Sequence, residues 1–80
     1  MNLRRLAVFV RVLEHGGITA AARSLGLPKS AVSQAVTLLE RELGVRLLHR
    51  SSRAVTATQA GAALRRRAEP ALRVIDEAAA

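Results

Sequence analysis

The stretch that decides the fold is residues 18–43, which read ITAAARSLGLPKSAVSQAVTLLEREL. Its first part, residues 19–25, is helical by propensity and closes at Gly26, a residue that tolerates left-handed backbone. After the turn Gly26-Leu27-Pro28, apolar residues recur at three- and four-residue intervals along one face up to Gly44, namely Val32, Ala35, Val36, Leu39 and Leu43. The stretch therefore predicts two helices joined by a tight turn.

The opposite face of the second of these helices carries hydrogen-bonding side chains and no acid: Ser30, Ser33, Gln34, Thr37 and Arg41. Two helices, a tight turn and a polar outer face form the layout of a helix-turn-helix, here at about residues 18–37. The major groove of DNA is about 12 Å wide and admits one helix, so side chains at the start of that helix can reach base edges. We therefore predict a DNA-binding element, against the alternative that this face is simply solvated.

Two further elements flank this stretch. Asn2 is predicted to cap a first helix, which ends at Gly16-Gly17 and whose apolar face carries Leu3, Leu6, Phe9, Val10 and Leu13. After Gly44 the helical period breaks, and two short runs, 46–48 and 54–56, flank the polar segment 49–53. These runs predict a small β-hairpin.

Thr58 is predicted to cap a last helix with an apolar stripe of Ala60, Leu64, Ala68, Ala71 or Leu72, Ile75 and Ala79. Pro70 removes a backbone hydrogen bond and pushes Glu69 away from helical geometry, which predicts a kink or a break there. A domain built by the first three helices leaves the stripe little to cover. We therefore predict a dimer seam of Leu64, Ala68, Ala71, Leu72, Ile75 and Ala79, and we assign the consecutive Arg65, Arg66 and Arg67 to solvated surface.

Charge and composition narrow the function. The 80 residues suffice for one small domain and carry 13 Lys and Arg against six Asp and Glu, a net charge of +7. This balance indicates a polyanionic partner, nucleic acid or acidic lipid. Twelve of the basic residues are arginines, which suit forked hydrogen bonds to phosphate or guanine, although a GC-rich coding genome is an alternative cause.

No residues for catalysis, metal binding or membrane insertion stand out. The chain has no Cys, His15 and His49 have no partner at metal-ligand spacing, and no two acids form a close pair. No glycine-rich phosphate loop occurs, so we predict neither an enzyme nor a cofactor. The first ten residues resemble the start of a signal peptide, but Arg11 and Glu14 interrupt the apolar run and no small-residue cleavage site follows. No apolar run reaches the ~18 residues of a membrane span. We predict a soluble protein that does not enter membranes.

Four motifs stand out within a pattern that spans essentially the whole chain: Ile18-Thr19-x-Ala21-Ala22-x-x-Leu25, Ser30-Ala31-Val32-Ser33, Leu39-Glu40-x-x-Leu43-Gly44-Val45-x-Leu47-Leu48-x-Arg50 and Thr58-x-Ala60-Gly61. Through them the chain resembles the LysR-type transcriptional regulators. The resemblance implies a mainly α fold, a winged helix-turn-helix in residues 1–58 with a three-helix core and a small β-hairpin wing. A long amphipathic linker helix in residues 59–80 then pairs with its twin in a homodimer.

The resemblance also implies a bacterial regulator of transcription in the cytoplasm, at the nucleoid. Family members normally continue into an effector-sensing domain, which is absent from these 80 residues, so the sequence describes either a truncated protein or one that works without a sensor. A longer chain would also allow higher oligomers.

This sequence departs from the family pattern at Pro28, Lys29, Gln34, Leu48 and Ala57, where members usually carry Ser, Gln, Arg, Phe and Leu. Pro28 removes the usual hydroxyl cap but pre-sets the backbone, so the start of the helix is expected to shift by a residue. Gln34 pairs with adenine where Arg favours guanine, which predicts a different half-site.

The site predictions follow from these positions. Ser33 and Gln34 are predicted to touch bases, and Lys29, Ser30 and Thr37 to touch bases or nearby phosphates. Thr19 is predicted to meet a phosphate with help from the helix dipole, or else to cap its helix. The predicted contacts of the wing to phosphate or minor groove come from Arg50, Arg53 and Thr58, although Glu40 or Glu42 is as good a partner for Arg50.

The leading function is sequence-specific binding of duplex DNA by a dimer. A sequence-indifferent architectural role, in which basic charge dominates, is the nearest alternative. An amphipathic basic peptide lying on an anionic membrane is a third, but the interrupted periodicity and the turn residues favour a folded domain.

Overall fold

A computed structural model of the chain describes residues 1–50 and 54–79. Its first helix, α1 (Leu3–His15), begins at Asn2, whose side-chain oxygen accepts a hydrogen bond from the Arg5 backbone N–H at 3.1 Å. The helix ends at Gly16, which has a left-handed φ of 73°, and the Gly17 N–H donates to the Val12 carbonyl at 3.1 Å. Both predicted ends of this helix are confirmed.

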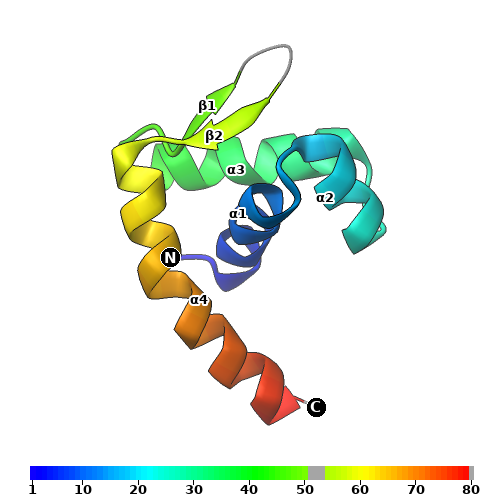
Figure 1. The fold of residues 1–80 in the computed structure, drawn as a ribbon, viewed down its shortest axis with the longest axis vertical. Coiled ribbons are helices and arrows are strands. Elements are labelled where there is room, and N and C mark those ends of the chain that lie inside the picture. Colours follow the sequence, from blue (N-terminus) through cyan, green and yellow to red (C-terminus); the bar gives the residue numbers. More distant parts are fainter. Residues whose placement is uncertain (51–53, 80) are drawn as a thin grey trace.

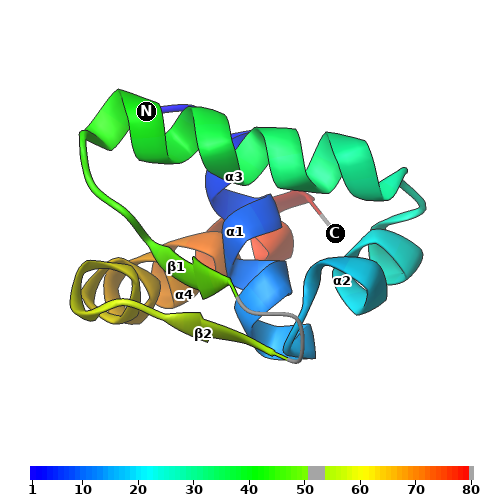
Figure 2. The same cartoon turned by 90° about the horizontal axis from the view of Figure 1, so that it is seen from above.

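The next two helices form the predicted helix-turn-helix. Helix α2 (Ile18–Leu25) starts one residue earlier than predicted, and α3 (Lys29–Leu43) starts directly after Pro28. Pro28 stands at the N-cap position with φ −63° and makes no side-chain cap, as the loss of the usual hydroxyl predicts. Figures 1 and 2 show α1 at the centre of the molecule, with α3 crossing it and α2 beside the start of α3.

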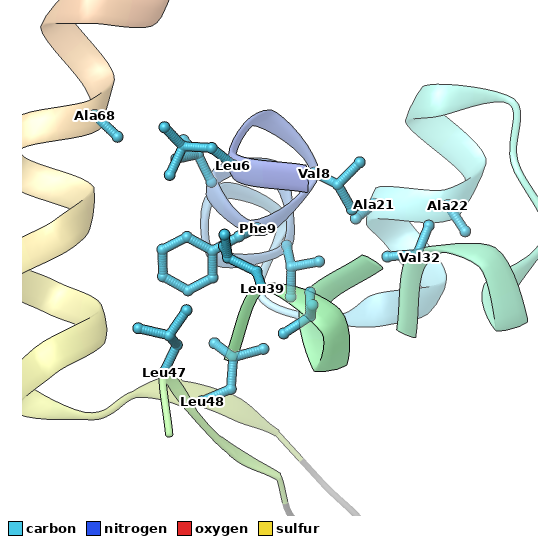
Figure 3. Packing of buried hydrophobic residues seen from close by; sticks show 13 residues of the cluster. Leu6, Val8, Phe9, Ala21, Ala22, Val32, Leu39, Leu47, Leu48 and Ala68 are labelled. Atoms are coloured by element: carbon cyan, nitrogen blue, oxygen red, sulfur yellow. The ribbon is translucent and has the colours of Figure 1, made fainter. Parts of the chain in front are cut away.

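One hydrophobic core joins all the elements. Phe9 is fully buried at its centre, and Figure 3 shows its ring pointing toward Leu47 and α4. The other buried apolar residues come from every helix and from the segment after α3: Leu6, Val8, Val10, Val12, Ala21, Ala22, Val32, Val36, Leu39, Leu47, Leu48 and Ala68. A core of aliphatic side chains around a single aromatic ring is what the composition requires.

The predicted apolar face of α1 was partly wrong. Leu3 is 56% exposed, whereas Val8 and Val12, which lie off that face, are buried. The reason is that α1 packs against α2 and α3 on one side and against α4 and the second strand of the hairpin on another. A central helix of this kind buries more than the single stripe expected of a surface helix.

The hairpin is present, but its strands are displaced along the chain. Strand β1 (Leu48–Arg50) pairs antiparallel with β2 (Val55–Ala57), in the register Leu48 with Ala57, His49 with Thr56 and Arg50 with Val55. The predicted runs, 46–48 and 54–56, were therefore two residues and one residue too early. We call β1 and β2 the wing.

The last helix, α4 (Gln59–Ala79), is continuous across Pro70, so of the predicted kink or break near Glu69 the break was wrong. Pro70 has no N–H to donate to the carbonyl of Arg66, four residues earlier. Both residues are exposed, so water can bond to that carbonyl instead. On either side of Pro70, Ala68 and Leu72 hold the helix against the core. No helix in the described part of the chain is long and apolar enough to cross a membrane.

More of the apolar stripe on α4 packs against the core of its own chain than predicted. Ala68 is buried, and Leu64 and Leu72 are partly buried against the core, because α4 packs along α1. By contrast Ala71, Ile75 and Ala79 are exposed, together with Val74. Of the residues predicted for the dimer seam, Ala71, Ile75 and Ala79 are therefore the exposed ones.

Two of the three consecutive arginines on α4 are solvated, as predicted. Arg66 and Arg67 are exposed, but Arg65 is half-buried and forms an ion pair with Glu69 one turn further on. A second ion pair links the helices, since Arg11 of α1 lies 3.7 Å from Asp76 of α4. These pairs are half-exposed and add little to stability.

The start of α4 forms hydrogen bonds to the segment that precedes the wing. The Thr58 hydroxyl accepts from the Gly61 N–H at 3.0 Å, which confirms Thr58 as the cap of the helix. The Thr58 N–H donates to the Leu47 carbonyl at 3.0 Å. A Cβ atom added to Gly61 would lie 2.0 Å from the same Leu47 oxygen, so this approach requires glycine.

A Gly61→Ala variant is therefore expected to be less stable than the wild type by about 1–3 kcal/mol, because the backbone of Leu47 must move to admit the methyl group. Thermal unfolding of the two proteins measures this as a fall of roughly 4–8 °C in Tm per kcal/mol. The matched control is Gly17→Ala, where the added Cβ meets no atom within 4 Å and the backbone is extended, at φ 174°. Equal melting of the two variants would contradict the close approach.

Candidate nucleic-acid interface

Helix α3 separates its apolar and polar residues onto opposite sides. Val32, Val36 and Leu39 are buried in the core. The predicted base-reading residues all lie outside it: Lys29, Ser30 and Gln34 are exposed, and Ser33 and Thr37 are half-buried at the side nearer the wing. The structure therefore brings all five onto one continuous surface along the first turns of α3.

The start of α2 lacks a side-chain cap. Its N-cap residue is Gly17, which makes no side-chain hydrogen bond, and Thr19 is exposed in the first turn. Thr19 therefore does not have the capping role that was its alternative. The first N–H groups of a helix carry a partial positive charge and suit an anion such as phosphate.

The wing is attached to α3 by a buried carboxylate. Glu40 is only 9% exposed, and its Oε2 accepts hydrogen bonds from the backbone N–H groups of Leu47 at 2.7 Å and Leu48 at 3.3 Å. The Arg46 guanidinium lies 3.5 Å from the same oxygen. Glu40 thus fixes the chain that enters β1 against the side of α3, a role that its place in the helical pattern did not predict.

Arg50 makes neither of the ion pairs considered for it from the sequence. Its Nη1 donates to the Ser33 hydroxyl of α3 at 3.1 Å, while Glu42 pairs with the N-terminal amine of Met1 at 3.4 Å. The wing therefore contacts a predicted base-reading residue directly. Arg53, the other predicted wing contact, lies outside the described residues.

A surface groove runs between α3 and the wing, and we call it the arginine groove. It is lined by Thr37, Glu40, Arg41, Gly44, Val45, Arg46 and Arg50. Three guanidinium groups against one carboxylate leave it positively charged, as an interface for a polyanion requires. Arg46 was missed in the sequence, because nothing in its spacing shows that the chain folds back along α3.

Thr58 does not present its hydroxyl to a ligand. The hydroxyl donates to the Arg46 carbonyl at 2.6 Å while it accepts from Gly61, so both of its functions are used within the chain. Thr58 thus helps to hold the backbone of Arg46, which lines the arginine groove. In the described part of the chain no three His, Cys, Asp or Glu side chains gather as a metal site would need.

A helix-turn-helix followed by a two-stranded wing defines the class of winged helix-turn-helix domains. The family model for bacterial regulatory helix-turn-helix proteins of the lysR family matches residues 3–62. The chain therefore belongs to the lysR family and carries its DNA-binding domain.

The relatives of the chain are named as regulators of transcription. It is 47% identical over 76 residues to an HTH-type transcriptional repressor of Pseudomonas aeruginosa, and 51% identical over 60 residues to the transcriptional activator AaeR of Escherichia coli. These matches cover 95% and 75% of this chain but only 24% and 19% of the relatives. The chain thus spans about a quarter or less of the length of the curated relatives it matches.

The fold is also that of a solved protein–DNA complex. The BenM DNA-binding domain bound to catB site 1 DNA matches with a TM-score of 0.92 at 37% sequence identity. The match covers 99% of this chain and 88% of that one. This agreement confirms the predicted winged helix-turn-helix fold.

Replacing Glu40 by alanine is expected to lower the free energy of unfolding by about 1–3 kcal/mol, because the N–H groups of Leu47 and Leu48 lose their acceptor inside the protein. Urea unfolding measures the difference. Glu42→Ala is the matched control, since it removes a half-exposed carboxylate from the same helix and should cost less than about 1 kcal/mol. Similar losses in the two variants would show that the Glu40 contacts stabilise nothing.

Proposed function

We propose that this chain binds duplex DNA in a sequence-specific manner, with α3 in the major groove. The observation that carries the proposal is the polar face of α3, which stands outside the core over several turns and holds no acid before Glu40. An α-helix with its side chains is about 10–12 Å across, which matches a groove about 12 Å wide. The DNA complex of a domain with the same fold supports DNA binding by this chain.

The proposed contacts divide into two kinds. Ser33 and Gln34 read bases, and Lys29, Ser30 and Thr37 read bases or hold the phosphates beside them. Thr19 at the start of α2 and the wing residues Arg50 and Arg53 hold the backbone, with Arg53 also able to enter the minor groove. Thr58 is assigned to support of the wing rather than to a phosphate, since its hydroxyl is already engaged.

The net charge of +7 supplies the sequence-independent part of binding through release of counterions from DNA. Control of transcription follows as the biological role, because the matched relatives are a repressor and an activator. A protein that acts on the chromosome works in the bacterial cytoplasm, at the nucleoid. The proposal needs neither a catalytic residue nor a cofactor.

The proposed form of the binding protein is a homodimer joined through α4. The exposed apolar residues Ala71, Val74, Ile75 and Ala79 support this seam, with Val74 64% and Ile75 43% exposed. Leu64 and Leu72 border the same side and are only partly covered by the core. Exposed apolar side chains grouped on one helix are typical of a surface that packs against a partner.

The base-reading role is tested by the double variant Ser33→Ala, Gln34→Ala, using selection of bound fragments from random duplexes. The wild type is expected to enrich a defined sequence, and the double variant to lose about tenfold or more of its preference at the base pairs concerned. The matched control is Ser24→Ala, Gln59→Ala, which removes exposed side chains of the same types outside α3. An unchanged preference in the first variant, or a wild type that binds all duplexes alike, would contradict the proposal.

The seam is tested by Val74→Glu, measured by sedimentation over a series of dilutions. A charge in the seam is expected to shift the protein from dimer toward monomer at equal concentration, while the melting temperature extrapolated to high dilution changes little because Val74 is 64% exposed in its own chain. Arg73→Glu, the neighbouring exposed residue on another side of α4, is the control and should leave the dimer intact. A wild type that remains monomeric at high concentration would refute the seam.

A further inference from the structure

The side chain of Arg50 is directed toward α3 by the alternation of the strand. Residues two apart in a strand lie on the same face, so Arg50 shares the face of Leu48, which is buried in the core. His49 between them points to the other face and is exposed. Arg50 therefore extends beyond the edge of the core, where its Nη1 donates to Ser33 Oγ at 3.1 Å, 17 residues away in the sequence.

Glu40 sets the position of β1 along α3. Glu40 holds the N–H groups of Leu47 and Leu48, and Glu40 and Ser33 are separated by two turns of α3, which places them on one face. The chain from Leu47 to Arg50 thus runs back along α3 from Glu40 to Ser33. The path of the backbone from Glu40 to Ser33 therefore places Arg50 beside Ser33.

The hydrogen bond limits what the Ser33 hydroxyl can do. A hydroxyl has one proton to donate and lone pairs with which to accept, and it normally rotates to suit its partner. The guanidinium of Arg50 can only donate, so the hydroxyl accepts from it and its own proton must point elsewhere. Donation from a cation also polarises the hydroxyl, which strengthens it as a donor.

We propose that Arg50 is a specificity-determining positioning residue, which fixes Ser33 as a hydrogen-bond donor toward DNA. This inference rests on the proposed function, in which Ser33 faces the major groove. With one lone pair taken by Arg50 and the hydroxyl polarised as a donor, Ser33 favours a base edge that presents an acceptor, as guanine does with O6 and N7, adenine with N7 and thymine with O4. Cytosine, which presents its N4 amino group, is disfavoured at that position.

Without Arg50 the constraint disappears. The Ser33 hydroxyl is then no longer polarised as a donor, and both of its lone pairs are free to accept from an amino group of a base. The remaining N–H groups of Arg50 are directed at no base by this contact, so any phosphate contact they make adds affinity for every sequence alike. The two roles of Arg50 therefore separate in an experiment that compares sequences.

The experiment is selection from random duplexes by the wild type, Arg50→Met and Arg41→Met, followed by affinity measurements on duplexes that differ at one base pair. Methionine keeps an unbranched apolar stem but has no N–H to donate. Arg41→Met removes the same charge from the same arginine groove, at a residue further along α3 from Ser33. Thermal unfolding of the three proteins checks that each is folded.

The wild type is expected to favour an acceptor-presenting base over cytosine at one position by about fivefold, the ratio that one hydrogen bond of about 1 kcal/mol gives. Arg50→Met is expected to abolish that preference and leave the other positions unchanged, while Arg41→Met weakens all sequences equally. Ser33→Ala should abolish the preference at the same position, and adding Arg50→Met to it should change nothing further there.

Two results would overturn the inference, and they differ from failure of the proposed function. One is that Arg50→Met weakens all sequences equally, as Arg41→Met does. The other is that Arg50→Met and Ser33→Ala alter different positions of the selected sequence. A wild type that selects no sequence at all would instead refute the proposed function, and the inference with it.

Discussion

The hydrogen bonds from the Leu47 and Leu48 N–H groups to the Glu40 carboxylate hold the rest of the structure in its arrangement. A carboxylate that is nearly out of water loses much of its hydration, and it is stable there only if donors replace that water. Two backbone N–H groups and the Arg46 guanidinium do so here. Because the donors belong to consecutive residues of the chain, satisfying the charge also fixes the direction in which the chain leaves α3.

The same short segment then receives α4. The Thr58 N–H donates to the Leu47 carbonyl and the Thr58 hydroxyl donates to the Arg46 carbonyl, while Gly61 allows the first turn of α4 to approach Leu47. This segment thus bonds to α3 through the N–H groups of Leu47 and Leu48, and to the start of α4 through the carbonyl groups of Arg46 and Leu47. The surface of α3, the wing and α4 are therefore linked through three residues, and a change at any of the three reaches all of these elements.

The sequence predicted the elements whose ends depend on single residues. Asn2, Gly16, Gly26 and Gly44 each stop or start a helix through a local backbone preference that needs no tertiary contact. The first strand was displaced because Glu40 and Arg46 attach the start of this segment to α3, so the strand begins only at Leu48. The burial of Val8 and Val12, the role of Ala68 and the contact between Arg50 and Ser33 arise from packing between distant segments, which periodicity along one helix does not contain.

The division of α4 into two faces connects the dimer to the choice of DNA. Ala68 and Leu72 bind α4 to its own α1, while Ala71, Val74 and Ile75 remain for the partner, so the proposed seam has a fixed orientation relative to α3. Two copies related by this seam carry two α3 helices at a distance that the fold sets. Paired recognition helices bind half-sites one helical turn of DNA, about 34 Å, or a multiple of it apart. In the proposed dimer, the contacts that bury Ala68 would act on DNA recognition as well as on stability, because they would set the spacing of the half-sites that the dimer can bind.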